Sequence, residues 1–254
     1  MNSKLIKSQE DIDKIREGGK LLADILARTA KMVRPGINTA ELNTFAEKEI
    51  YSVGGRPSFK GYGDKRNPFP TGLITSINEV VVHGIPDKNA ILQEGDIVGL
   101  DIGMEYKGRY TDMAITVPVG KISKDAQKLL NVTEEALRLA VKQARPGNKI
   151  GDIAATTQAH VEKNGFNVVR DLVGHGVGYG VHEDPQVPCY GKPGTGLTLE
   201  AGMVLAIEPM VVTGSHRLTV EADGWSISTA DGGLAAHFEH TVAITKKGPE
   251  ILTK

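Results

Sequence analysis

The segment DIVGLDIGMEYKGRYTDMAITVPV (residues 96–119) carries the clearest structural signal in the chain. Two strand-like runs rich in Val, Ile and Thr flank a turn centred near 106–108, which is typical of a β-hairpin. If a four-residue loop spans 105–108, Asp101 and Asp112 lie directly opposite each other on neighbouring strands. Like charges that face each other among apolar neighbours are destabilising unless a cation or a proton offsets them. The hairpin therefore predicts a metal site or, alternatively, an aspartate that caps the turn or faces solvent.

Two similar helical patterns stand on either side of this hairpin. Apolar or small residues recur at helical spacing over 12–33 and over 129–144, and each pattern ends at an Arg-Pro-Gly breaker. The two breakers lie 111 residues apart. A second, shorter helical pattern follows each breaker, over 42–50 and over 150–161. The matching order suggests an internal repeat.

Each half of this repeat also places a carboxylate in an apolar, strand-like segment. Asp101 lies in LQEGDIVGLDIG (92–103) and Glu208 lies in LTLEAGMVLAIEP (197–209), each six residues after a glycine. The two carboxylates are 107 residues apart. The alternative is coincidence, because Arg-Pro-Gly is a common helix stop, but four successive matching features favour the repeat.

The repeat predicts an α+β fold. We expect a single catalytic domain over 1–254, made of two related, pseudo-symmetric halves at about 10–120 and 121–250. In each half, helices would pack on one face of a shared, mostly antiparallel sheet.

Composition excludes several classes of function. The net charge of -1 gives no electrostatic basis for binding nucleic acid or an anionic membrane. The N-terminal segment lacks the apolar core of a secretory signal, and no apolar run approaches the roughly 20 residues of a membrane span. The single cysteine, Cys189, excludes an internal disulfide and a Cys-based zinc site, and we expect it to be a small, partly buried hydrophobe. We expect a soluble, cytoplasmic protein.

Two further acids strengthen the metal interpretation. Glu208 in MVLAIEPM and Glu239 in LAAHFEHTVAIT lie in apolar segments, where an ionised glutamate is rarely buried without a partner. His175, from the glycine-rich stretch DLVGHGVGYGVHEDPQ (171–186), adds an imidazole. Such a set can hold two divalent ions bridged by carboxylates at a separation of roughly 3.5–4 Å. Oxygen-rich ligation with one imidazole suits Mn, Fe or Co better than a structural zinc site.

Other kinds of site are not supported by the sequence. The glycines around His175 do not form G-x-G-x-x-G, because Tyr179 occupies the place of the third glycine, and no P-loop or G-x-S-x-G pattern occurs. We expect His160 at the surface and His216 in a loop, and we expect structural or supporting roles for these two residues and for His237 and His240.

As a set, five motifs resemble the type I methionine aminopeptidases, which have the pita-bread fold. They are SINEVVVHGIPD (76–87), DIVGLDIG with Asp112 eleven residues after Asp101, VGHGVGYGVHEDPQVP (173–188), LAIEP (205–209) and FEHTVAIT (238–245). The resemblance covers nearly the whole chain. It implies a dimetal metallopeptidase, a hydrolase that removes the initiator methionine from nascent polypeptides and prefers a small second residue.

The resemblance also implies roles for particular residues. The ligands of two divalent ions would be Asp101, Asp112, His175, Glu208 and Glu239, with Asp112 and Glu239 bridging. His182 would hydrogen-bond the scissile carbonyl as charge develops on its oxygen, and His83 would bond the substrate near the scissile amide. Glu208 would accept a proton from the attacking water. The methionine pocket would be lined by Tyr62, Ile74, Val181 and Trp225.

The chain departs from the family pattern near this pocket. Ile74 stands where bacterial members commonly have a cysteine, Val181 where an aromatic residue is frequent, and His237 where a glutamine is common. The loop GYGDKRNPFPTG (61–72) also looks longer than usual. We expect these changes to affect rate and side-chain preference more than reaction class.

Two competing functions stay open. Proline-directed peptidases such as prolidase share the fold but usually carry an additional N-terminal domain, for which the early start of the repeat leaves no room. A pita-bread binding protein without catalysis would characteristically lose ligands, whereas all five are present here. We expect a monomer that acts on the N-terminal methionine of nascent peptides, and the sequence leaves open both a ribosome contact and zinc as the metal.

Overall fold

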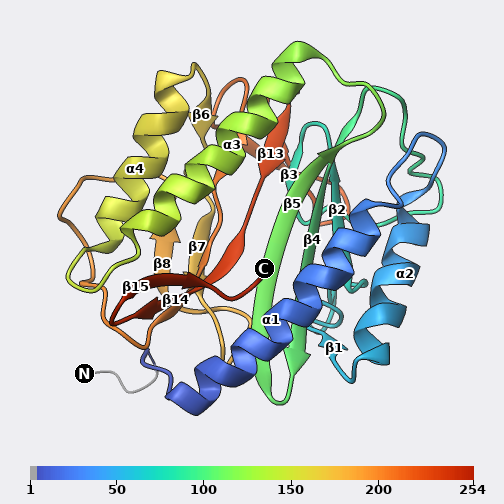
Figure 1. Cartoon of the computed structure of the whole chain (residues 1–254). Helices are drawn as coiled ribbons and strands as arrows, with labels where there is room; N and C mark the ends of the chain where they lie inside the picture. Colours follow the sequence, from blue (N-terminus) through green and yellow to red (C-terminus); the bar gives the residue numbers. More distant parts are fainter. Residues whose placement is uncertain (1–4) are drawn as a thin grey trace.

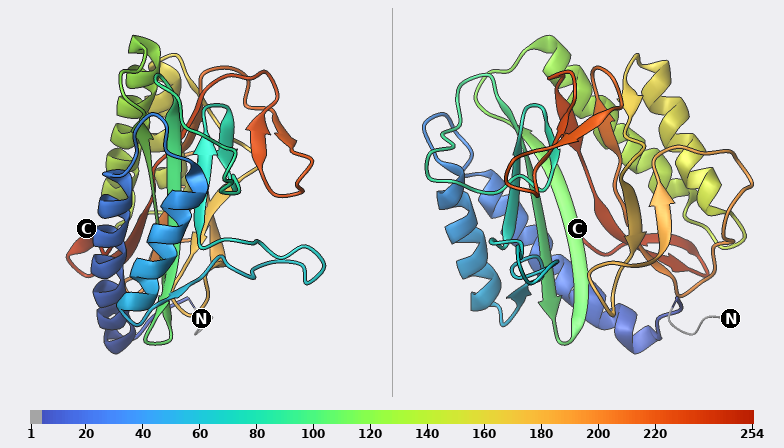
Figure 2. Two further views of the ribbon diagram at one scale, coloured as in Figure 1. Left: turned by 90° about the vertical axis from the view of Figure 1, so that its right-hand side faces the viewer. Right: turned by 180° about the vertical axis from the view of Figure 1, so that it is seen from behind.

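The structure is a computed structural model in which residues 5–254 are described. Helices α1 (Gln9–Ala30), α2 (Thr39–Ser52), α3 (Lys124–Gln143) and α4 (Ile150–Lys163) gather on one side of the molecule, and the strands lie behind them (Figures 1 and 2). These helices coincide with the four predicted helical patterns. Within 5–254, no helix combines the length and the apolar character needed to cross a membrane.

Within residues 5–254, the strands form four antiparallel sheets. One sheet contains β1 (Arg56–Pro57), β2 (Leu73–Ile77), β4 (Ile97–Tyr106) and β5 (Arg109–Pro118), and another contains β7 (Val173–Gly176), β8 (Glu183–Pro188), β9 (Val204–Ile207), β14 (His240–Thr245) and β15 (Gly248–Ile251). A smaller sheet contains β6 (Asn167–Val168), β10 (Met210–Val212) and β13 (Ala235–His237). Another contains β3 (Val80–Val82), β11 (Leu218–Val220) and β12 (Ile227–Thr229). The predicted α+β class is confirmed, with the strands divided among sheets.

The hairpin β4–β5 has a tighter turn than the sequence suggested. Tyr106 pairs with Arg109, so the loop contains only Lys107 and Gly108, both of which have positive φ as a two-residue type I′ turn requires. Asp101 consequently pairs with Ala114 rather than with Asp112. The prediction that the two aspartates lie directly opposite was therefore wrong.

Asp101 and Asp112 are instead diagonal neighbours on one face of the hairpin. Asp112 pairs with Gly103, two residues along β4 from Asp101, and residues two apart on a strand point to the same side. Diagonal neighbours lie about 7–8 Å apart, within reach of a shared ligand between the side chains.

The two Arg-Pro-Gly breakers have the same local structure. Gly36 and Gly147 both have positive φ, and each donates its N–H to a carbonyl, of Leu92 and Leu199 respectively. These matched contacts are the reason why we propose that the chain consists of two related halves.

Strand β5 also meets the segment 237–241, which brings the two larger sheets together (Figure 1). The Glu239 N–H donates to the Ala114 carbonyl at 2.8 Å. The Asp112 N–H donates to Thr241 Oγ1 at 2.9 Å, and that hydroxyl donates back to the Asp112 carbonyl. This seam places Glu239 beside Asp112 although 127 residues separate them in the sequence.

Candidate active site

A cavity of about 220 Å³ opens between the two larger sheets. Its lining includes every site residue predicted from the sequence except Val181. The lining residues are Phe59, Tyr62, Phe69, Ile74, Val82, His83, Asp101, Asp112, Leu172, Val173, His175, His182, Glu208, Met210, Trp225, His237 and Glu239. The lining thus combines apolar side chains with carboxylates and imidazoles.

Each of the five predicted ligands comes from a different strand or strand end. Asp101 and Asp112 belong to β4 and β5, and His175 belongs to β7. Glu208 follows β9 and Glu239 precedes β14. Because strands fix the direction of their side chains, a rigid framework holds all five toward the cavity.

The five side chains approach one another closely enough to share ions. Ligand atoms lie within 4.8 Å of one another in the sets Asp101–Asp112–Glu239 and His175–Glu208–Glu239, so Glu239 is common to both. His175 Nε2 lies 3.4 Å from Glu208 Oε1 and 3.9 Å from Asp112 Oδ2. Two neighbouring three-ligand groups with a shared carboxylate are the arrangement that a bridged metal pair needs.

The electrostatics of three of the acids favour a bound cation. Asp101, Asp112 and Glu239 are all buried. Burial raises the pKa of each carboxyl, and the charges of the neighbouring carboxylates raise the pKa of Asp112 and Glu239 further. Asp101 Oδ1 and Glu239 Oε1 also have no hydrogen-bond partner among residues 5–254. A divalent ion fits this set, because it would give both oxygens a partner and offset the repulsion.

Glu208 differs from the other acids because two histidines, His175 and His237, lie close to its carboxylate oxygens. His237 Nε2 lies 3.3 Å from Glu208 Oε2. Burial would raise the pKa of Glu208, but His237 and the nearby histidines outweigh burial and lower that pKa. Burial lowers the pKa of His237, but the hydrogen bond with Glu208 and the charge of Glu208 outweigh burial and raise that pKa. The surroundings of Glu208 therefore favour the ionised form of its carboxyl group.

His182 belongs to the loop that joins β7 to β8. Its ring lies edge-to-face with the ring of His175 at 4.4 Å and with the ring of Tyr62 at 4.9 Å. Partial burial and the neighbouring His175 lower the pKa of His182. The imidazole is therefore neutral near pH 7, and a neutral imidazole donates one hydrogen bond.

His83 is held in an unusual backbone conformation. Its φ is +59°, in the left-handed region that side chains other than glycine rarely adopt and that costs about 1–3 kcal/mol. The next residue, Gly84, packs so tightly that an added Cβ would lie 2.2 Å from the Thr75 carbonyl oxygen. The strained turn and the close contact together fix the His83 ring at the cavity wall.

The apolar wall is larger than the sequence suggested. Ile74 and Val181 are buried in one cluster with Phe59 and Phe69, and the partly buried Trp225 packs against it. Val181 lies behind the wall, whereas both phenylalanines line the cavity. Sequence reasoning missed Phe59 and Phe69, although Phe59 lies just before the glycine-rich loop 61–72 and Phe69 lies within it.

Loop 61–72 projects from the molecule on the side away from the helices (Figure 2). The loop closes on itself, because Gly61 N–H donates to the Phe69 carbonyl and Phe69 N–H donates to the Tyr62 carbonyl. Trp225 Nε1 donates to the Asn67 carbonyl at 3.1 Å. The loop and the tryptophan thus hold each other in place beside the cavity.

The remaining histidines and Cys189 lie outside the cavity lining. His240 Nδ1 contacts Thr253 Oγ1 at 3.0 Å. His160 is half-buried rather than at the surface as predicted, because its Nε2 turns inward from helix α4. Cys189 is buried, and its thiol lies 3.5 Å from the Glu208 carbonyl. Burial raises the pKa of Cys189 to about 12, so the thiol stays protonated.

Comparison with known proteins agrees with this geometry. Residues 13–246 match Metallopeptidase family M24. The chain is 49% identical to a methionine aminopeptidase of Clostridium perfringens over 98% of both chains. It is 40% identical to the methionine aminopeptidase of Escherichia coli over 98% of this chain and 93% of the relative.

Solved structures give the same relationship. A methionine aminopeptidase from Thermotoga maritima superimposes with a TM-score of 0.95 at 45% identity, over 98% of both chains. A prolidase from Pyrococcus furiosus reaches a TM-score of 0.80 at 22% identity and 66% of its length, which establishes a shared fold alone. The chain therefore belongs to metallopeptidase family M24 and, within it, to the methionine aminopeptidases.

Proposed function

We propose that the protein hydrolyses the first peptide bond of polypeptides that begin with methionine, and that it uses two divalent ions held by Asp101, Asp112, His175, Glu208 and Glu239. The observation that carries this proposal is the pair of three-ligand groups that share Glu239 beside an apolar pocket. The ligand groups would supply the chemistry, and the apolar pocket would select the side chain.

The donor set supports the inference about the metal. Four carboxylates and one imidazole suit Mn, Fe or Co, and zinc is a further candidate because it also accepts oxygen and nitrogen ligands. A third group of close ligand atoms joins Asp112 to His175 and His182, so Asp112, His175 and Glu239 each occur in two groups. Because a carboxylate has two oxygens to offer, we infer that Asp112 and Glu239 would each help to hold both ions. When bound, the ions would polarise the scissile carbonyl and make the attacking water more acidic.

The protein's own residues have separate tasks in the proposed reaction. The Glu208 carboxylate would accept the proton from the attacking water, for which its ionised form is required. The neutral His182 would donate a hydrogen bond to the carbonyl oxygen as negative charge develops there. His83, whose ring centroid lies 6.3 Å from that of Trp225, would bond the substrate near the scissile amide.

The pocket accounts for the selection of methionine. Ile74, Phe59 and Phe69 present buried apolar surface, and Trp225 closes one side with its ring 5.3 Å from that of Phe69. An unbranched thioether fills an irregular apolar slot well, whereas a charged or cyclic side chain does not. We further infer a small second residue, because a bulky one would move the carbonyl away from the ligands, and about 1 Å of misplacement can cost on the order of 10²-fold in rate.

One chain supplies every residue that this proposal uses, so we expect a monomer that acts on nascent chains in the cytoplasm. The direct test is a peptide assay on Met-Ala peptides with protein that has been stripped by a chelator and reloaded with Mn, Fe or Co. We expect methionine release only after reloading. Full activity with less than one ion per chain, measured by elemental analysis, would contradict the proposal.

A further inference from the structure

The glycine-rich loop that carries His182 needs an anchor. Residues 177–182 connect β7 to β8, and glycines at Gly178 and Gly180 leave the backbone free to adopt many conformations. His182 makes ring contacts with His175 and Tyr62, but neither contact fixes the backbone of the loop. The position of the imidazole must therefore be set by what holds the rest of the loop.

We propose that a cluster of charged and polar residues outside the cavity, the anchor cluster, positions His182 and Val181 for the reaction. The cluster consists of Lys7, Asp11, Arg109, Tyr179 and Glu183. This inference rests on the proposed function, because it assigns positioning residues for the same site. None of its members lines the cavity.

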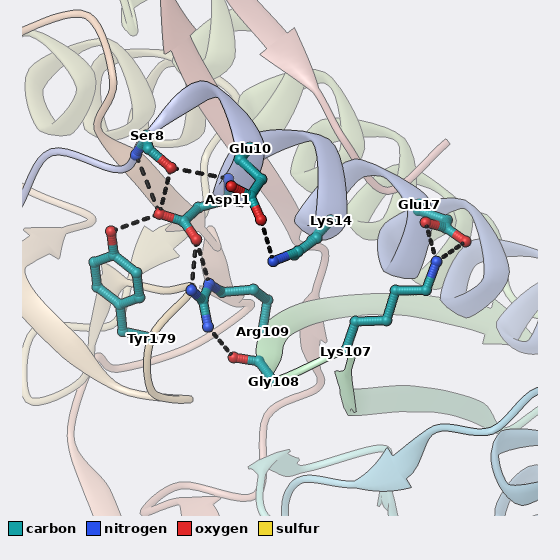
Figure 3. Close-up of polar contacts among 9 residues, drawn as sticks. All are labelled: Ser8, Glu10, Asp11, Lys14, Glu17, Lys107, Gly108, Arg109 and Tyr179. Atoms are coloured by element: carbon teal, nitrogen blue, oxygen red, sulfur yellow. Dashed lines mark hydrogen bonds and ion pairs between the residues drawn. The ribbon is translucent and has the colours of Figure 1, made fainter.

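Asp11 is the centre of one half of the anchor cluster (Figure 3). The Tyr179 hydroxyl donates to its Oδ2 at 2.8 Å, and Arg109 Nε donates to its Oδ1 at 2.7 Å. Ser8 Oγ also donates to Oδ2 at 2.7 Å. The same two residues form the capping box that begins helix α1, in which the Ser8 N–H donates to Asp11 Oδ2 and the Asp11 N–H donates to Ser8 Oγ. Asp11 thus joins the helix, the β4–β5 turn and the glycine-rich loop through one carboxylate.

Glu183 is the centre of the other half. Its Oε1 accepts the N–H groups of Tyr179 and Gly180, and its Oε2 accepts a hydrogen bond from Lys7 Nζ at 2.6 Å. The Lys7 side chain is only 1% exposed, so this ion pair is shielded from solvent. Hydrogen bonds to charged groups are about twice as strong as neutral ones, and here two of them fix the loop backbone itself.

The Tyr179 ring links the two halves. Lys7 Nζ and Arg109 Cζ each lie 5.0 Å from the ring centroid, so both cations make cation–π contacts with one aromatic side chain. The neighbouring Gly178 carbonyl accepts the Tyr110 N–H at 2.9 Å. Every part of the loop between Gly178 and Gly180 is therefore held from outside the cavity.

The anchor cluster is close enough to the site to control its geometry. Glu183 follows His182 directly in the chain, and Val181, which packs in the apolar cluster with Ile74, precedes His182. A shift of the loop would move the hydrogen-bond donor and the pocket wall together. His175 would stay in place, because β7 pairs with β9 at that position.

Tyr179→Phe is the most selective variant, because it removes only the hydroxyl that reaches Asp11. The matched control is Glu17→Gln. Glu17 accepts hydrogen bonds from Lys107 Nζ at 2.7 and 2.8 Å, so this contact ties the same helix to the same β4–β5 turn without touching the loop (Figure 3). A second comparison, Glu183→Gln against Glu183→Ala, keeps or removes the acceptor of the two backbone N–H groups.

Three measurements on the metal-loaded protein decide the proposal. We expect Tyr179→Phe to lower kcat for a Met-Ala peptide about tenfold, in the range expected when a catalytic group is slightly misplaced. Metal affinity should stay at the wild-type value, and amide hydrogen exchange of residues 177–183 should become faster. Glu183→Ala should show the same changes more strongly, and Glu183→Gln should restore most of kcat. Glu17→Gln should change neither kcat nor loop exchange.

The opposite outcomes separate this inference from the proposed function. If Tyr179→Phe and Glu183→Ala lower the melting temperature but leave kcat and loop exchange at the values of Glu17→Gln, the cluster has only a structural role and the inference is wrong. If the metal-loaded wild-type protein releases no methionine, the proposed function is wrong. The amide hydrogen exchange of residues 177–183 would still report whether the anchor cluster holds the loop.

Discussion

The rings of His175 and His182 lie 4.4 Å apart with their planes at 74°, although they are held in different ways. His175 is part of β7, which pairs with β9 at Ala206. His182 lies in the loop after that strand, which side chains from helix α1 and the β4–β5 turn hold in place. In the proposed reaction, a rigid metal ligand at His175 and a separately held hydrogen-bond donor at His182 would therefore act on the same substrate bond.

We expect His182→Ala to lower kcat by about 10²-fold or more, because the variant loses a hydrogen bond that strengthens as charge develops. Metal content should not change. Steady-state kinetics on a Met-Ala peptide with elemental analysis measures both. His216→Ala, in a loop outside the cavity lining, is the control. A raised KM with unchanged kcat would mean that His182 only binds substrate.

Metal loading should raise the melting temperature of the stripped protein. The buried Asp101, Asp112 and Glu239 repel one another, and an ion that binds only the folded state stabilises it by about 2.7 kcal/mol per site at a hundred times its Kd. Calorimetry at increasing Mn concentration measures the shift. Asp112→Asn combined with Glu239→Gln should abolish the dependence on Mn, and a shift of wild-type size in that variant would place the ions elsewhere.

A peptide panel tests the pocket. Peptides that begin with methionine should be cleaved fastest, norleucine and leucine should be tolerated in part, and proline and lysine should be refused, because the wall around Ile74 and Trp225 is apolar. Ile74→Ala should raise KM for methionine peptides by enlarging the slot, whereas Val220→Ala, at an exposed position, should not. Rapid release of proline or lysine would overturn the assignment of the pocket.

The lowered pKa of Asp11 predicts that the protein loses stability in acid. Burial alone would raise the pKa of Asp11, but hydrogen bonds from Ser8, Tyr179 and Arg109 outweigh it and hold that pKa well below its usual value of 3.8. A carboxyl with a lowered pKa in the folded state contributes stability above its unfolded pKa and loses it as the pH falls below that value.

Asp11→Asn should therefore lower the free energy of unfolding at pH 7, and the difference from wild type should shrink below about pH 4. Urea titrations at pH 7, 5 and 3.5 measure it. Asp24→Asn, at an exposed position on the same helix, should change the free energy of unfolding little at any of these pH values. A deficit in Asp11→Asn that is constant with pH would show that the ionisation of Asp11 does not matter for stability.

Local patterns in the sequence were enough to predict several parts of this protein. Helical periodicity located the four helices, alternation and a glycine turn located the β4–β5 hairpin, and acids in apolar segments indicated a metal site at Asp101, Asp112, Glu208 and Glu239. These features depend on neighbouring residues in the chain, whose backbone preferences and periodicity the sequence states directly. The relation between the two halves stays a prediction.

Other features depended on how distant segments pack. The tightness of the turn made Asp101 and Asp112 diagonal rather than opposite. The approach of His237 and other histidines lowered the pKa of Glu208, whereas the pKa values of Asp101, Asp112 and Glu239 are raised. Tyr179 and Asp11 are 168 residues apart, and no periodicity or motif links them. Their contact exists because helix α1 and the glycine-rich loop pack at the same turn of β4–β5, and such a meeting is set by the shape of the whole folded chain rather than by any local stretch.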